Sequence, residues 1–359
     1  MIKKDLFNNE KTLIIIIAVL VGLFAILLLF PNITNPIKNI INEEKIYSVE
    51  IIKINGCDDC FNLESLSSGL SKINNIKIKN EEEIEYNSQE GKKLLDKYDI
   101  QTVPALIILS NKINKIVLND ALFRKVDNAA IFDKSVPYVD LDSNDIVGMV
   151  SLAEIYDSGC NECAALGDIK KQFESMGVKV KNYDMISSTS EKGKELISKN
   201  GMSYIPSLLI SKDIEKYWWI FDSLKGYLTE YDNWYRFSQP AFPYKEISSG
   251  KIKGKVEITY IINKSCEDCF NATQVKDLFE SAGIYIAKEK YINISSGEGK
   301  NLVAQYNITA VPTGILSKEI TDYTHLKDNL EKIGTFEKDG SFVFRKLDII
   351  STKYQEIKK

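Results

Sequence analysis

Three Cys-x-x-Cys pairs, each followed by a proline at nearly the same distance, constrain this sequence more than any other feature. The pairs contain all six cysteines of the 359-residue chain: Cys57/Cys60, Cys160/Cys163 and Cys266/Cys269. They begin 103 and 106 residues apart, and a proline lies 46 or 47 residues after each first cysteine: Pro104, Pro206 and Pro312. Cysteines kept only for packing would be scattered, so the pairing indicates redox or metal chemistry.

The sequence around each proline repeats as well. Thirteen residues before it stands a glycine followed by a lysine: Gly91-Lys92, Gly193-Lys194 and Gly299-Lys300. A branched apolar residue comes immediately before it, namely Val103, Ile205 or Val311, and an apolar run follows. A period of this length corresponds to a domain rather than to a solenoid repeat. We therefore predict three modules: module 1 (residues 45–145), module 2 (146–252) and module 3 (253–359).

Strand and helix patterns alternate within each module. In module 1, residues 47–54 are β-branched and apolar and predict a strand that ends just before the cysteines. Apolar residues at helical spacing predict a helix over residues 57–70, so that the cysteines lie in its first turn. A strand near residue 77, a helix over 91–98, a strand after the proline and an antiparallel partner at 113–118 complete the pattern. The fold class is α/β, with a mixed central sheet flanked by helices.

An apolar segment precedes the first module. Residues 12–30 form 19 consecutive positions without a charge, which is nearly enough for a helix to cross a bilayer. A cleaved secretory signal is the alternative, but the run is longer than a usual signal core and no small-x-small site follows it. Lysines are denser before the segment than after it. We expect residues 1–11 in the cytoplasm, residues 12–30 in the membrane, a linker at 31–44 and the modules outside.

The pattern of a Cys-x-x-Cys pair after a strand and a proline before an apolar strand resembles the thioredoxin superfamily. The resemblance covers about residues 45–359, and three such domains on one chain are similar to protein disulfide isomerases. It implies that Cys57, Cys160 and Cys266 are nucleophiles and that Cys60, Cys163 and Cys269 resolve mixed disulfides. It also implies that Pro104, Pro206 and Pro312 are cis-prolines. With Val103, Ile205 and Val311 before them, they would offer a strand edge to substrate backbone.

Acidic residues between the cysteines depart from the familiar motifs of that superfamily. They are Asp58-Asp59 in module 1, Glu267-Asp268 in module 3 and Glu162 in module 2. Because negative charge opposes a thiolate, we expect weaker oxidants than the DsbA type. The alternative is that these residues only stabilise the first turn of the predicted helix, as acidic side chains do whatever the cysteines do. Glu154, six residues before Cys160, is a candidate buried acid, although the same offset places Ile51 and Tyr260 in the other modules.

These features favour a thiol–disulfide oxidoreductase that acts on extracytoplasmic protein thiols, with an unidentified membrane or soluble redox partner. A net charge of −4 gives no reason to expect nucleic-acid binding, and no cofactor is expected. A Cys₄ zinc site would need two pairs much closer in sequence, so no metal is expected. Inert disulfides are a further alternative, although so short a loop stabilises little. A scaffold that binds unfolded chains through three such folds is the alternative function.

Overall fold

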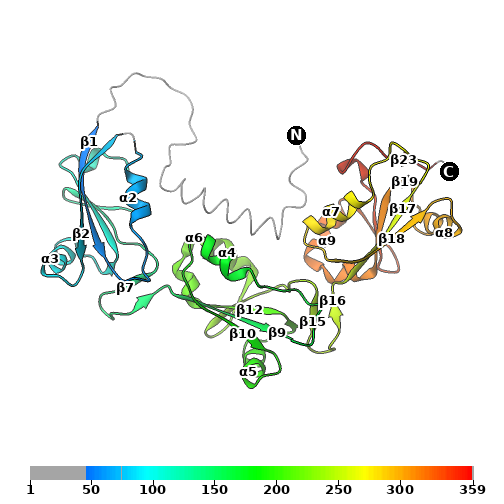
Figure 1. Ribbon diagram of the computed structural model, residues 1–359, viewed down its shortest axis with the longest axis horizontal. Helices are drawn as coiled ribbons and strands as arrows, with labels where there is room; N and C mark the ends of the chain where they lie inside the picture. The colour runs from blue at the N-terminus through cyan, green and yellow to red at the C-terminus, as the bar shows by residue number, and fades with distance from the viewer. Residues whose placement is uncertain (1–45, 74, 358–359) are drawn as a thin grey trace.

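The computed structural model describes residues 46–73 and 75–357 of the chain. These residues form three bodies that follow one another along the chain, from blue and cyan through green to orange in Figure 1. Within this described part, no helix has both the length and the apolar character needed to cross a membrane. The predicted membrane segment at residues 12–30 lies outside the described residues.

Each body is built on a five-stranded mixed sheet, and the three sheets have corresponding strand orders: β2-β1-β4-β6-β5, β10-β9-β12-β14-β13 and β18-β17-β20-β22-β21. In each sheet the first two strands are parallel and joined through a helix, whereas the strand after the proline is antiparallel to the first. The predicted mixed α/β class and the threefold repetition are therefore confirmed.

The elements of the three bodies correspond closely, and their bounds are as follows. Module 1 contains β1 (Tyr47–Asn55), α2 (Glu64–Leu70), β2 (Ile76–Glu85), α3 (Gln89–Tyr98), β3 (Thr102–Val103), β4 (Ala105–Leu109), η1 (Ile113–Lys115), β5 (Arg124–Val126), β6 (Ala129–Phe132) and β7 (Tyr138–Asp140). Module 2 contains β8 (Ile146–Val147), β9 (Val150–Tyr156), α4 (Ile169–Ser175), β10 (Val180–Ser187), α5 (Glu191–Lys199), β11 (Tyr204–Ile205), β12 (Ser207–Ser211), η2 (Lys212–Lys216), α6 (Trp218–Leu224), η3 (Lys225–Tyr227), β13 (Leu228–Glu230), β14 (Trp234–Phe237), β15 (Tyr244–Glu246) and β16 (Ile252–Lys253). Module 3 contains β17 (Val256–Ile262), α7 (Thr273–Ser281), β18 (Ile286–Asn293), α8 (Gly297–Gln305), β19 (Ala310–Val311), β20 (Thr313–Leu316), η4 (Lys318–Asp322), η5 (Thr324–Leu326), α9 (Lys327–Leu330), β21 (Gly334–Phe336), β22 (Phe342–Phe344), η6 (Leu347–Ile349) and β23 (Gln355–Glu356).

Every sheet is covered on both faces, which gives each module two apolar clusters. In module 1, Leu106 and Ile108 of β4 pack in the cluster that contains α2, whereas Ala105 and Ile107 pack in the cluster that contains α3. Successive strand residues point to opposite faces, so a strand that is buried on both sides reads as a continuous apolar run. This explains the apolar run after each proline.

The repeated glycine in the Gly-Lys pairs is required by close backbone approach. A serine caps the start of α3, α5 and α8, and its hydroxyl accepts a hydrogen bond from the amide of Gly91, Gly193 or Gly299. A Cβ on these glycines would lie only 2.0–2.2 Å from a backbone carbonyl oxygen at the end of the preceding strand. A larger residue would therefore push the helix away from the sheet.

Two predicted elements are wrong. The helix expected over residues 57–70 begins only at Glu64, and the cysteines precede it in a turn. The segment expected to be an antiparallel strand at 113–118 begins with a short 3-10 helix, η1, and β6 is the strand that pairs with β4. Ile113 lies in this helix and Ile116 directly follows it, and the side chains of both point inward and are buried.

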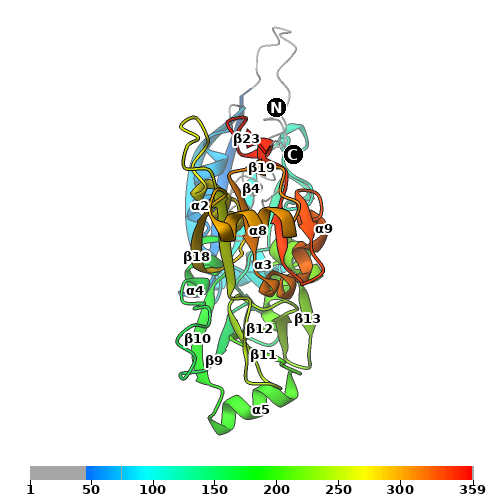
Figure 2. The ribbon, with the colours of Figure 1, turned by 90° about the vertical axis from the view of Figure 1, so that its right-hand side faces the viewer.

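Small accessory sheets join consecutive modules: β3-β7-β8 and β11-β15-β16, with a two-stranded counterpart β19-β23 in module 3. β8 lies just past the predicted boundary at residue 145 and still pairs with β7 of module 1. Figures 1 and 2 both show β23 beside β19 at one end of module 3. The domain boundaries themselves stay a prediction.

Candidate functional sites

The predicted cysteine pairs form three disulfides, each in the loop after the first strand of its module. The Cα atoms are 5.0 Å apart in Cys57–Cys60 and 5.5 Å apart in the other two pairs. All six cysteines are half-buried. The structure therefore forms a candidate redox site at the same place in every module.

A hydrogen bond from outside the loop prevents the helix from starting at the cysteines. The amide of Cys60 bonds to the carbonyl of Cys57 in a tight turn, and the next amide, of Phe61, donates to the carbonyl of Pro137 at 2.9 Å. Equivalent bonds join Ala164 to Pro243 at 2.7 Å and Phe270 to Lys353 at 2.8 Å. An amide used in this way cannot bond to the carbonyl four residues earlier, as a helix requires. The helices therefore begin only after the cysteines, at Glu64, Ile169 and Thr273, and no helix N-terminus lies at the first cysteine to favour its thiolate.

The predicted prolines follow cis peptide bonds in all three modules, and in modules 1 and 3 they lie beside the cysteine loop. The peptide bonds Val103-Pro104, Ile205-Pro206 and Val311-Pro312 are all cis, as the resemblance implies. A Cβ on Gly56, next to Cys57, would lie 2.9 Å from the carbonyl oxygen of Val103, and Cys269 Sγ lies 3.8 Å from that of Val311. In modules 1 and 3 the structure thus brings the cysteine loop and the strand before the proline together, as predicted.

A later segment of each module pairs with that strand. We name these segments straps: strap 1 (residues 136–141), strap 2 (242–247) and strap 3 (352–357). Antiparallel pairing joins the residue before each proline to a strap residue: Val103 to Val139, Ile205 to Lys245 and Val311 to Gln355. The last strap amide also donates to the strand: Leu141 to Gln101 at 3.0 Å, Ile247 to Ser203 at 2.9 Å and Ile357 to Thr309 at 2.7 Å.

The straps use the backbone edge that was predicted to receive substrate. In an antiparallel ladder, hydrogen-bonded pairs alternate with non-bonded pairs. Because Gln101 accepts a bond from Leu141, the pair two residues on, Val103 with Val139, is again a hydrogen-bonded pair. The same register holds in the other two modules. The amide and carbonyl of the residue before each proline are therefore directed at a strap.

Strap side chains also contact the cysteine loop in modules 2 and 3. Lys245 of strap 2 forms an ion pair with Asp157, and its Nζ lies 2.6 Å from Asp157 Oδ2. Lys245 and the amide of Gly159 hold the pKa of Asp157 below its usual value. At the equivalent place in module 3, Asn263 Nδ2 donates to Gln355 Oε1 at 2.6 Å. The strap, the loop and the strand before the proline therefore form one connected site.

The acidic residues between the cysteines differ in their surroundings. Asp59 in module 1 forms an ion pair with Lys179 of module 2 at 3.2 Å, and Glu162 in module 2 contacts Lys255 of module 3. Within residues 46–73 and 75–357, no ion pair involves Glu267 or Asp268. Negative charge beside the first two disulfides is thus partly compensated by the following module, whereas that of module 3 is not.

At one buried position of the first strand, each module carries a different titratable side chain. Lys53, Glu154 and Tyr260 each pair with the residue two positions after the proline of their module, so these three positions are equivalent. The offset from the cysteines suggested Ile51 instead of Lys53. Glu154 accepts a hydrogen bond from the Tyr183 hydroxyl, and burial together with this bond raises the pKa of Tyr183. Tyr260 donates to Glu289 at 3.0 Å. A buried acid is therefore present in module 2 alone among the three equivalent positions.

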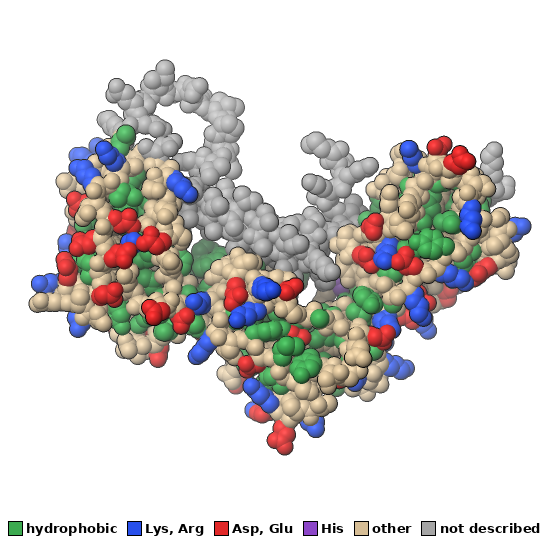
Figure 3. All heavy atoms as spheres, viewed as in Figure 1, with side chains coloured by type: hydrophobic (Ala, Val, Ile, Leu, Met, Phe, Trp, Pro, Cys, Tyr) green, Lys and Arg blue, Asp and Glu red, His purple; other side chains and the backbone are tan. Residues whose placement is uncertain are grey.

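Lys53 is the equivalent group in module 1, and three carboxylates surround it: Glu64, Glu81 and Glu83. Burial by itself would lower the pKa of Lys53, but the hydrogen bonds to these carboxylates outweigh burial and raise it. Acidic side chains of β2 gather on the face of module 1 seen in Figure 3. The modules therefore have the same backbone arrangement but differ in the charge and hydrogen bonding of this buried side chain.

The straps are the part of the candidate site that was not predicted from the sequence. A signal was present, because Pro137-Tyr138 and Pro243-Tyr244 repeat at equivalent positions after the sheet. Both of these prolines also follow cis peptide bonds. Strap 3 has Lys353-Tyr354 at these positions, so the proline is missing from the third copy and the repeat is harder to see.

Comparison with known proteins gives fold-level likeness only. No protein-family model and no curated protein matches the chain. A protein disulfide oxidoreductase from Aeropyrum pernix K1 is 16% identical, covering 47% of this chain and 77% of its own, with a TM-score of 0.16. The alkylhydroperoxide reductase component AhpF from Enterococcus faecalis is 18% identical, with coverages of 47% and 81% and a TM-score of 0.17. Full-length ERdj5 is 8% identical, with coverages of 90% and 45% and a TM-score of 0.17. TM-scores this low support no conclusion about the sites of this chain.

Proposed function

We propose that this chain is a thiol–disulfide oxidoreductase of extracytoplasmic proteins, held at the membrane by residues 12–30 with its N-terminus in the cytoplasm. The observation that carries the proposal is a half-buried Cys-x-x-Cys disulfide and a cis-proline in each module, with the cysteine loop against the strand before the proline in modules 1 and 3. A two-residue spacing closes too short a loop to stabilise a fold much, so a purely structural role accounts poorly for three copies.

The chemistry follows from the reactivity of thiolates. In the reduced site, the thiolate of the first cysteine attacks a client disulfide, and the client's sulfur–sulfur bond breaks as a mixed disulfide forms. The released client thiolate takes up a proton. The second cysteine then attacks the first, which releases the other client thiol and leaves the site oxidised. A dithiol redox partner restores the reduced site, and the reverse sequence would oxidise clients.

Cysteine-to-serine variants test this proposal. Replacing the second cysteines, Cys60, Cys163 and Cys269, should trap mixed disulfides that a reductant releases, because no resolving thiol remains. Replacing the first cysteines should abolish both trapping and exchange. If both sets of variants exchanged thiols as fast as the parent chain, the scaffold function would account for the fold better.

A further inference from the structure

The three straps are held in unequal ways. Straps 1 and 2 are the middle strands of three-stranded sheets, because β8 and β16 pair with their outer edges. Strap 3 pairs only with β19 among the described residues. Gln355 and Glu356 of strap 3 are exposed, whereas Val139 of strap 1 is 4% exposed. A strand bonded on one side is displaced at a smaller cost than a strand bonded on both sides.

The first residue of each strap shows the same contrast. Val136 of strap 1 belongs to the main apolar cluster of module 2, and Phe242 of strap 2 packs on that of module 3. The Phe242 ring stacks on Tyr323 with a centroid distance of 3.9 Å. Strap 3 has Thr352 at this position, and it is exposed. The following module therefore anchors straps 1 and 2, whereas the described contacts of strap 3 all lie within module 3, where Tyr354 and Ile357 pack on its apolar clusters and Lys353 and Gln355 bond to the cysteine loop.

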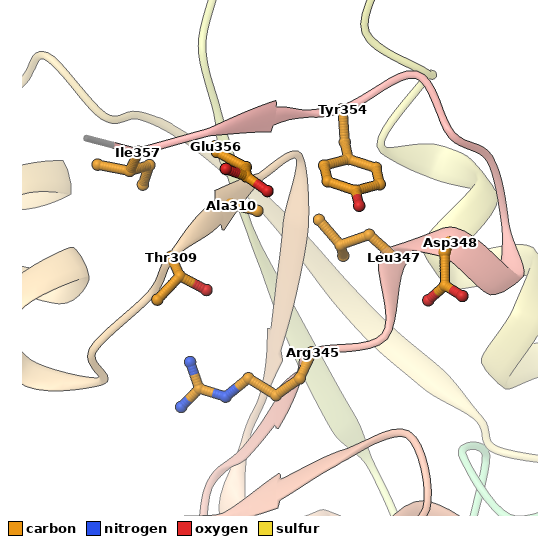
Figure 4. Close-up of a pocket in the computed structure, with 8 residues that line it drawn as sticks. All are labelled: Thr309, Ala310, Arg345, Leu347, Asp348, Tyr354, Glu356 and Ile357. Carbon is orange, nitrogen blue, oxygen red and sulfur yellow. The ribbon is translucent and has the colours of Figure 1, made fainter. Parts of the chain in front are cut away.

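A cavity of about 370 Å³ lies beside strap 3. Tyr354, Glu356 and Ile357 of the strap form part of its wall, opposite Ala310 of β19 and Arg345, as Figure 4 shows. Side chains that border a cavity lack packing partners on that side, so they contribute less to holding their segment in place. Strap 3 is thus the least anchored of the three.

We propose that strap 3 occupies the client-docking edge of module 3, and that an extended client segment displaces it to pair with Ala310–Val311. This inference rests on the proposed function and identifies the module that clients reach. The edge already binds an extended antiparallel segment, which indicates the kind of partner that fits it. Modules 1 and 2 keep their straps, and Cys266 is the cysteine that attacks the client disulfide, with Cys269 resolving the product as described above.

The test uses the full chain with Cys57, Cys60, Cys160 and Cys163 replaced by serine, so that only module 3 can react. In this background Gln355→Pro removes the amide that pairs with Val311. Glu356→Pro is the matched control, because the Glu356 amide belongs to a non-bonded pair and is directed away from β19. A chain that ends at Ser351 removes the strap altogether. Dithiothreitol supplies the electrons, and the substrates are hydroxyethyl disulfide and an extended peptide with an internal disulfide.

Relative to hydroxyethyl disulfide, Gln355→Pro and the shortened chain should reduce the peptide about fivefold faster than the parent, a change that corresponds to about 1 kcal/mol, the net value of one backbone hydrogen bond. Because Lys353 and Gln355 also bond to the cysteine loop, the hydroxyethyl disulfide rate serves as the reference for each variant. The ratio of the peptide rate to this reference rate should rise about fivefold in both strap variants, whereas Glu356→Pro should leave the ratio at the parent value. An unchanged or lower ratio in both strap variants, with hydroxyethyl disulfide still reduced, would overturn the displacement mechanism. Failure of every chain to reduce either substrate would instead reject the proposed function.

Discussion

The Tyr217 hydroxyl holds the segment that leads into β9 of module 2, and replacing Tyr217 by phenylalanine gives a sharp test of this contact. The side chain is fully buried. Its hydroxyl donates to the carbonyl of Gly148 at 2.8 Å and accepts from the amide of Lys179 at 2.9 Å. Tyr217→Phe keeps the ring and its packing but leaves both backbone groups without this partner. Each lost bond costs about 1 kcal/mol, and more where the remaining group stays buried, so we expect a loss of about 2–3 kcal/mol.

Tryptophan fluorescence measures this loss selectively. All three tryptophans of the chain, Trp218, Trp219 and Trp234, lie in module 2, and the Trp219 ring contacts that of Tyr217. With a urea dependence of about 1–3 kcal/mol per molar for a domain of this size, the midpoint of the fluorescence transition should fall by about 1 M.

Module 3 supplies the matched control. Tyr323 donates in the same way to Gly254 and accepts from the amide of Tyr285. Tyr323→Phe should destabilise module 3 and leave the tryptophan transition almost unchanged. If Tyr217→Phe left the midpoint unchanged, the hydroxyl would not stabilise module 2. If both variants shifted the midpoint equally, the modules would not unfold as separate units.

Three further predictions concern charge. Lys53→Met should destabilise module 1 near pH 7 and much less near pH 3, because the surrounding carboxylates repel one another only when ionised. Hydrogen exchange of the β1 amides measures this loss of stability. Lys245 holds the pKa of Asp157 below its ordinary 3.8, so their contact stabilises module 2 above about pH 4 and is lost as the pH falls further. Lys245→Met should therefore lower the urea midpoint of the tryptophan fluorescence transition at pH 7 but not at about pH 2. Burial lowers the pKa of His325 from 6.5, so the folded state binds fewer protons than the unfolded state below that pH. Hydrogen exchange of module 3 should therefore show a stability that falls from pH 7 to pH 5, and His325→Phe should weaken that dependence.

The sequence predicted the repeated elements because their causes are local and occur three times. Apolar runs buried on two faces and a glycine that permits close approach leave patterns at fixed offsets, as Gly91 illustrates. The helix after the cysteines was placed too early because its start depends on a bond from Phe61 to Pro137, 76 residues away in sequence. No local propensity reports such a contact.

The candidate site was predicted only in part for the same reason. Cysteines and prolines carry their own signals, whereas the straps are short segments whose role depends on tertiary pairing. The sequence offset aligned Glu154 with Tyr260 correctly but missed Lys53, because the loop before the cysteines is shorter in module 1 and shifts the count. The residue two positions after the proline pairs with Lys53, Glu154 or Tyr260 in every module. An alignment that starts from the proline would therefore have matched these residues.

The reduction potential of each site, measured in chains that keep one cysteine pair at a time, tests the central claim most directly. Acidic residues beside the cysteines oppose the thiolate, so we predict potentials more reducing than the roughly −120 mV of strong oxidants, and between about −200 and −290 mV. Module 3 should give the lowest value, since lysines of the following module pair with Asp59 and Glu162 alone. Three potentials below about −300 mV, as in structural disulfides, would contradict a redox function for this chain.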